Sequence, residues 1–178
     1  MTNFHRPALA AILMLSACSS LPHKVADGVV DGWNPPSAAA ARRLLALYGL
    51  PDDVTRNRLT WNDKGAFKRI VVWNHPLRYR SPRDFDLIEE TVAYPTTREQ
   101  AAELVSFSPA LTVDTGRGEI SARGSREAAN LLTLNLADEV LRGRKTSAEA
   151  RTAYLRILDL TAAGKSSPYT ESLFFIGR

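Results

Sequence analysis

Apolar and polar residues recur along the chain at spacings that predict helices and strands in a definite order. The first helix is predicted over residues 38–48, which are rich in Ala and Leu. Ser37 is placed to cap its start, and Gly49 followed by Pro51 is placed to end it.

Two hairpins are predicted from pairs of strand-like runs that are joined by glycine-containing turns. The first joins residues 58–62 to residues 66–74, and the second joins residues 110–115 to residues 119–123. Residues 75–84 between them contain two prolines and three arginines, so we expect a loop there.

The remaining pattern gives one more strand and three more helices. In the predicted strand over residues 86–94, Ile88 and Val92 lie on one face. The helices are predicted from capping signals followed by apolar residues at helical spacing. Those signals are Thr96 with Glu99 for a helix to about residue 107, Ser125 for a helix to residue 142, and Thr146 with Glu149 for a helix to residue 163.

The order of these elements predicts an α+β fold. Hairpin-linked strands favour an antiparallel sheet of about five strands, built from two hairpins and one further strand. We expect the helices on one face of the sheet, with two of them at the C-terminal end. The apolar run over residues 173–176 should pack on the domain, because a free apolar tail would be a sticky peptide.

The first 36 residues differ from the rest. A basic opening, which includes Arg6, precedes an apolar run over residues 8–15, and small residues follow it. This layout is typical of a secretory signal peptide, and the run is about half of the ~20 residues that a membrane span needs. We therefore expect residues 1–17 to be cleaved, residues 18–36 to be a flexible tether, and residues 37–178 to form one domain.

The four residues Leu15-Ser16-Ala17-Cys18 resemble the lipobox of bacterial lipoproteins. The resemblance implies that the Cys18 thiol carries diacylglycerol, that palmitate-type acyl chains anchor the chain, and that the membrane is a partner through this lipid. In Gram-negative lipoproteins, Ser19 at the next position implies release to the outer membrane, and we expect the domain to face the periplasm.

Charge and composition exclude several classes of function. The chain of 178 residues has 23 Lys and Arg against 19 Asp and Glu, and these charges are interspersed, so we expect no nucleic-acid partner. Cys18 is the only cysteine, and His23 and His75 are the only histidines beyond the predicted cleavage point. This residue set has no metal-ligand spacing, so no metal site and no cofactor are expected.

Catalytic signals are weak. His75 is the only histidine in the predicted domain, and no G-x-S-x-G elbow accompanies it. The segment Gly116-Arg117-Gly118 is interpreted as a turn, because a strand pattern follows it where a phosphate loop would precede a helix. The adjacent acids are interpreted as solvated surface; they are Asp52-Asp53, Glu89-Glu90 and Asp138-Glu139.

Two basic clusters could contact a partner or an anionic surface. They are Arg78, Arg80 and Arg83 in the predicted loop, and Arg142, Arg144 and Lys145 at the end of the predicted helix over residues 125–142. Asn130 and Asn135 lie in an otherwise apolar helical pattern, so they face solvent, satisfy a buried network or line a pocket.

Residues 38–62 resemble the start of small outer-membrane-assembly lipoproteins of the SmpA/OmlA type. The shared features are the helix exit Gly49-Leu50-Pro51-Asp52 and the aromatic Trp61 on the strand that follows. This resemblance implies a scaffold that docks an envelope protein. The sequence therefore favours a non-enzymatic envelope interaction or structural module, and the alternative is a small periplasmic hydrolase or ligand-binding domain with a cleft near His75.

Overall fold

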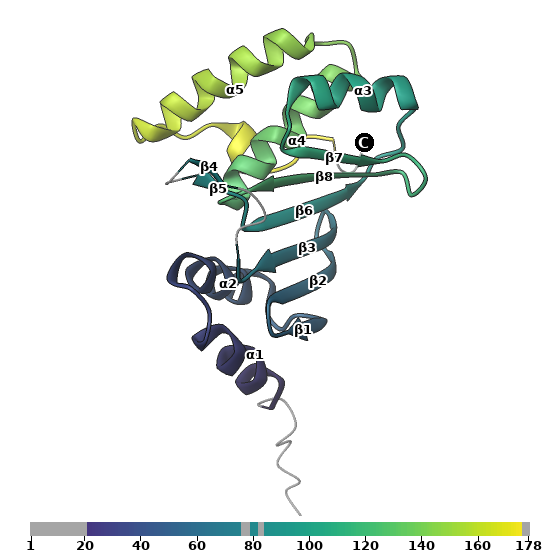
Figure 1. Cartoon of the computed structure of the whole chain (residues 1–178). Helices are drawn as coiled ribbons and strands as arrows, with labels where there is room; N and C mark the ends of the chain where they lie inside the picture. The colour runs from purple at the N-terminus through teal and green to yellow at the C-terminus, as the bar shows by residue number, and fades with distance from the viewer. Residues whose placement is uncertain (1–20, 76–78, 82–83, 176–178) are drawn as a thin grey trace, which may run out of the picture.

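The computed structural model of the chain describes residues 21–75, 79–81 and 84–175, and it shows an α+β fold (Figure 1). A six-stranded antiparallel sheet has the strand order β1-β2-β3-β6-β8-β7. Its strands are β1 (Asp53–Thr55), β2 (Arg58–Lys64), β3 (Phe67–Trp73), β6 (Ile88–Ala93), β7 (Leu111–Asp114) and β8 (Glu119–Gly124). The helices are α1 (Leu21–Asp31), α2 (Pro35–Tyr48), α3 (Arg98–Phe107), α4 (Glu127–Leu141), α5 (Ser147–Ala162) and the short 3-10 helix η1 (Pro168–Thr170).

The sheet confirms the predicted hairpins and adds strands that the pattern did not predict. Hairpins β2–β3 and β7–β8 form as expected, and β6 lies between β3 and β8. The short strand β1 extends the sheet at its edge by pairing with β2. The predicted loop over residues 75–84 is corrected, since it contains strand β4 (Tyr79–Ser81), which pairs with β5 (Asp84–Phe85).

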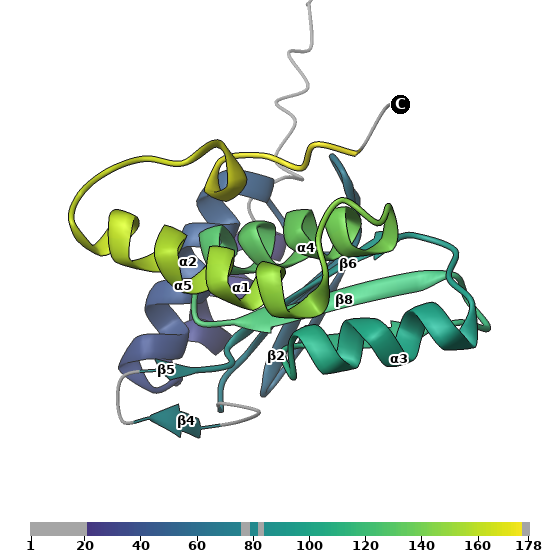
Figure 2. The same cartoon turned by 90° about the horizontal axis from the view of Figure 1, so that it is seen from above.

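One face of the sheet carries the hydrophobic core, because alternate residues of each strand point to the same side. Leu59 and Trp61 of β2 lie in register with Val72 and Ile70 of β3, and all four are buried. Helices α2 and α4 cover this face (Figure 2). On the opposite face, polar side chains pair across strands: Arg69 lies 3.3 Å from Glu119.

The start of α2 differs from the sequence prediction. Ser37 is not the cap: the helix begins at Pro35, and the side chain of Asn34 caps it by accepting a hydrogen bond from the Ser37 amide at 3.1 Å. Proline is favoured at this first position because it has no amide to leave unpaired. The buried Ser37 hydroxyl is then free to donate to the carbonyl of Asn74 at 2.7 Å.

Helix α1 corrects the prediction of a flexible tether over residues 18–36. Residues 21–31 are helical, and Ala26 and Val30, four residues apart, are fully buried against the body. Trp33 is 7 % exposed, and its indole N–H donates to the carbonyl of Arg56 at 2.9 Å. The folded domain therefore includes α1 from Leu21, rather than starting at residue 37.

Three other predicted caps have mixed outcomes. The capping box of α5, Thr146 with Glu149, is confirmed. The box of α3 is shifted by one residue, since Thr97 pairs with Gln100. Ser125 does not cap α4, because Arg126 occupies the cap position and makes no side-chain cap hydrogen bond.

The segment after α5 packs back on the domain, as predicted, as far as Phe175. The buried Asn135 amide donates to the carbonyls of Tyr169 at 3.0 Å and Ser172 at 2.7 Å, and its oxygen accepts from the Phe174 amide at 2.9 Å. Of the alternatives for Asn135, the buried network is the one that the structure shows.

Candidate functional site

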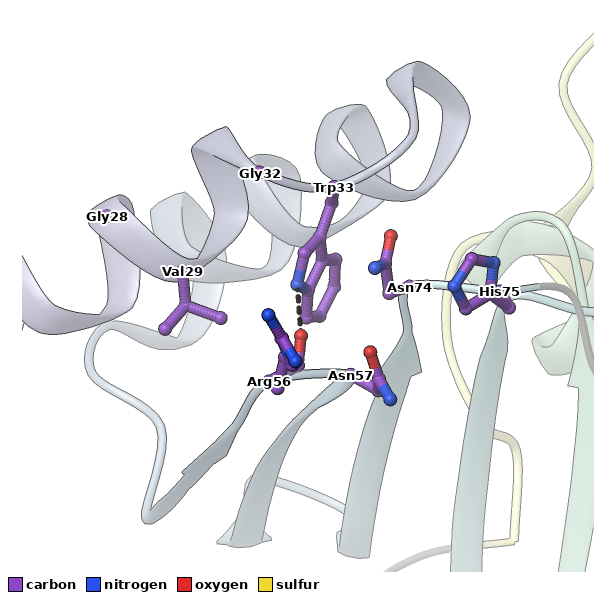
Figure 3. A pocket seen from close by; sticks show the side chains of 8 residues that line it. All are labelled: Gly28, Val29, Gly32, Trp33, Arg56, Asn57, Asn74 and His75. Carbon is purple, nitrogen blue, oxygen red and sulfur yellow. Dashed lines mark hydrogen bonds between the residues drawn. The ribbon is translucent and has the colours of Figure 1, made fainter.

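A cleft of about 730 Å³ lies between α1 and the adjacent ends of the sheet strands (Figure 3). Val29 and Trp33 project into it from α1 and the turn that follows, opposite the two-residue turn between β1 and β2. The lining residues are Gly28, Val29, Gly32, Trp33, Arg56, Asn57, Asn74 and His75. The cleft therefore combines the N-terminal helix with two turns of the sheet.

Asn74 fixes the geometry of this cleft. Its side-chain oxygen accepts from the Asn34 backbone amide at 3.0 Å and from the Asn34 side chain at 3.2 Å. Its own backbone amide donates to the carbonyl of Asn57 at 2.8 Å, and its carbonyl accepts from Ser37. One buried residue thus joins the α1–α2 connection, the β1–β2 turn and the end of β3.

The polar groups that line the cleft are amides, an imidazole and a guanidinium. Arg56, Asn57 and His75 are exposed, and no salt bridge involves Arg56 within the described part of the chain. None of the eight lining residues carries a carboxylate, a hydroxyl or a thiol. These groups can donate hydrogen bonds to an anion, but they include no serine or cysteine nucleophile.

A second polar cluster lies beneath the start of α4. Glu90 of β6 is fully buried on the core face, in register with Ile70 and Ala122, and neither carboxyl oxygen accepts a hydrogen bond of good geometry. Glu127 accepts a hydrogen bond from the Tyr48 hydroxyl. Tyr48 and Glu127 also line a hollow of about 540 Å³ that opens between α2, α4 and η1.

The electrostatics of this cluster oppose ionisation of Glu90. Burial, and then the charge of Glu127, raise the pKa of the Glu90 carboxyl well above its ordinary 4.5, and the neighbouring Asn130 amide offsets only part of this effect. Burial and the bond to Glu127 likewise raise the pKa of Tyr48. Asn130 is itself buried, and its amide donates to the carbonyl of Ile88 at 3.2 Å.

Glu90 corrects the interpretation of Glu89-Glu90 as solvated surface. Glu89, 9 % exposed, points to the opposite face of the sheet and pairs with Arg123. The signal for Glu90 was present in the sequence, since Ile88, Glu90 and Val92 are two residues apart and must share a face.

The other adjacent acids differ from one another in burial. Asp138 is 4 % exposed, so its interpretation as solvated surface is wrong as well. Its carboxylate accepts from the Tyr94 hydroxyl at 2.8 Å. Asp52 and Asp53 are exposed, as predicted.

Only part of the first basic cluster lies within the described residues. Arg78 and Arg83 lie outside them, and for Arg80 the structure describes only its position in β4. Cys18 also lies outside the described range. Their predicted roles stay predictions.

The second basic cluster is largely committed to contacts within the fold. Arg142 pairs with Asp138 at 2.7 Å, and Lys145 pairs with Glu139 at 3.3 Å. The ion pair with Asp138 raises the pKa of the Arg142 guanidinium. Arg142 and Arg144 are both exposed, and of the three Arg144 is the one without a salt bridge within the described residues.

Two further searches cover the described residues. Within the described ranges, no group of three or more His, Cys, Asp or Glu side chains could hold a metal ion. Among the helices that the structure describes, none is long and apolar enough to cross a membrane.

Comparison with family models, with curated proteins and with solved structures finds no match to this chain. The function therefore has to be argued from the chain's own residues and from the two sites described above.

Proposed function

We propose that this chain is a lipid-anchored binding module of the bacterial envelope, attached to the outer membrane through Cys18 and facing the periplasm. One observation carries the proposal. Helix α1 begins three residues after Cys18, docks on the body through Ala26 and Val30, and forms one wall of the cleft. An anchor at Cys18 would hold the cleft close to the membrane surface.

The proposed docking surface for an envelope protein lies at the end of the molecule opposite α1 and the cleft. Helices α3 and α5 lie at the far end from α1 (Figure 1). Val105 on α3 is 58 % exposed and Leu155 on α5 is 62 % exposed. Exposed large apolar side chains of this kind are typical of docking surfaces when they gather in a patch. The resemblance of residues 38–62 to outer-membrane-assembly lipoproteins supports a docking role of the same kind.

Hydrolysis or small-ligand binding in the cleft is the second candidate. The observation in its favour is that His75 does line a cleft, together with Arg56 and two asparagines. Since the lining residues include no serine or cysteine nucleophile, a hydrolytic version would need water activated by His75. The lining favours binding over hydrolysis.

The test is mass spectrometry of the chain purified from Gram-negative membranes, with Cys18→Ala as the variant. We expect the mature N-terminus to be a diacylglycerol-modified Cys18, and the chain to fractionate with the outer membrane. The Cys18→Ala variant should lack the lipid and leave the outer-membrane fraction. A wild-type chain that starts at another residue, or that carries no lipid, contradicts the anchor.

Crosslinking of the lipidated chain from Leu155 then tests the partner. A photoreactive residue at position 155 should capture a defined envelope protein, whereas one at exposed Asp52 should not. No capture from position 155, combined with turnover of an envelope substrate that His75→Ala abolishes, would exclude the docking role and favour hydrolysis.

A further inference from the structure

We propose that the cleft beside α1 binds the phosphate of an anionic phospholipid headgroup. The choice of a lipid as the source of the phosphate rests on the proposed anchor at Cys18. The preference of the cleft for a phosphate rests on its own lining and is independent of the anchor.

The lining supplies donors and positive charge without a competing carboxylate. The Arg56 guanidinium offers several N–H donors, the Asn57 amide offers two, and His75 adds a ring N–H. Of the acids on the neighbouring elements, Asp31 pairs with Arg42 and Asp53 pairs with Arg58. Asp27 of α1 is exposed and is not among the residues that line the cleft. A phosphate oxygen is the ligand type that matches such a set of donors.

Two glycines open the cleft on the α1 side. Gly28 and Gly32 are four residues apart and both line the cleft, so no side chain covers the helix backbone at these positions. A Cβ atom added at Gly28 would meet nothing within 4 Å, and one at Gly32 would make only an ordinary contact of 3.6 Å with the Val29 carbonyl. Neither backbone conformation nor close packing requires glycine at these two positions, so the absence of side chains on this wall of the cleft needs another explanation. Room for a ligand provides one.

The size of the cleft and its distance from the anchor fit a headgroup. A volume of about 730 Å³ lies within the range of small-molecule sites. Cys18 and Leu21 can be at most roughly 11 Å apart along the chain, and the helical rise from Leu21 to Gly28 adds about 10 Å. The α1 wall of the cleft at Gly28 therefore lies within about 25 Å of the Cys18 sulfur, where headgroups are the most abundant phosphate source.

The experiment uses the full lipidated chain in nanodiscs of phosphatidylcholine, titrated with water-soluble probes and followed by NMR. The probes are glycerophosphoglycerol, which is the deacylated headgroup of phosphatidylglycerol, and inorganic phosphate. We expect saturable binding of glycerophosphoglycerol, with shifts at residues 28–33, 56–57 and 74–75, and at least tenfold weaker binding of inorganic phosphate.

Three variants locate the binding. Arg56→Ala should weaken glycerophosphoglycerol binding at least tenfold. Gly28→Leu should abolish it by filling the cleft, while its Tm stays at or above that of the wild type, because leucine favours a helix more than glycine does. Gly28→Ala checks that the position accepts a side chain. Arg156→Ala, which removes an exposed arginine on α5, is the matched control and should bind as the wild type does.

Each contrary result has a defined meaning. Absence of saturable binding, or binding that survives both Arg56→Ala and Gly28→Leu, overturns the site. Inorganic phosphate binding as tightly as glycerophosphoglycerol overturns the lipid assignment and leaves a free-phosphate site. Because both probes are soluble, these outcomes are read independently of whether Cys18 carries a lipid, which the mass spectrum reports.

Discussion

At the scale of single residues, burial of charge decides the behaviour of Glu90. The Glu90 carboxyl lies on the core face, and neither of its oxygens accepts a hydrogen bond of good geometry. Burial and the charge of Glu127 raise its pKa well above the ordinary value and so favour the neutral form. Protonation has a free-energy cost that grows as the pH rises above the ordinary pKa of the group. The wild-type fold is therefore less stable at neutral pH than it would be with a permanently neutral side chain at this position.

Glu90→Gln should raise the free energy of unfolding at pH 7, because the folded wild type must hold a proton that the unfolded chain has released, whereas glutamine carries no such cost. The folded state binds a proton that the unfolded state releases above pH 4.5, so wild-type stability falls as pH rises from 4.5 to the raised pKa of Glu90. The variant should lack this fall. Urea unfolding of both proteins between pH 4.5 and 8 measures the difference, and parallel profiles would show that Glu90 is not neutral in the fold.

Asn74 is a second residue whose contribution to stability can be tested, because its side chain joins two segments of the fold. Asn74→Ala removes the acceptor of both the Asn34 backbone amide and the Asn34 side chain, so we expect a loss of about 1–3 kcal/mol. Asn57→Ala, at an exposed turn position of the same cleft, is the matched control and should change stability by less than about 0.5 kcal/mol. Equal unfolding midpoints for the two variants in urea would contradict the role of Asn74 as a junction.

At the scale of elements, the sequence predicted those whose signals are local. Hairpins β2–β3 and β7–β8 and the Thr146 box of α5 follow from turn glycines and capping residues that act within a few positions. Helix α1 did not follow, because Gly28 and Pro22 obscure its pattern and it is stabilised by docking on distant residues. The lining of the cleft could be predicted only in part for the same reason. The sequence suggested a cleft near His75, but the contact between Trp33 and Arg56 depends on the docking of α1.

The docking of α1 can be tested separately from the fold. Val30→Asp places a charge at a fully buried position and should release α1, so amides from residue 25 to residue 33 lose protection from hydrogen exchange while those of β3 and β6 keep it. Val25→Asp, at a position that is 57 % exposed, should leave protection unchanged. If Val30→Asp lowers protection across the sheet as well, α1 is part of the cooperative core rather than a docked element.

At the scale of the whole molecule, the cleft and the helices with exposed apolar side chains lie at opposite ends of the fold. Helix α1 and the cleft lie at one end, and α3 and α5 lie at the other (Figure 1). If Cys18 carries the lipid, this separation sets an orientation in which the cleft meets the headgroups, while α3 and α5, which carry the exposed Val105 and Leu155, lie at the end away from the membrane. The proposed headgroup site and the proposed partner surface can then be occupied at the same time.

This orientation is the central claim, and paramagnetic relaxation in nanodiscs measures it most directly. The lipidated chain is placed in nanodiscs whose lipids carry a nitroxide on the headgroup, and the broadening of each backbone amide signal is recorded. The account predicts the strongest broadening in α1 and at Arg56, Asn57 and His75, with the α5 signals unaffected. Uniform broadening over the domain, or stronger broadening in α5 than in α1, would contradict it.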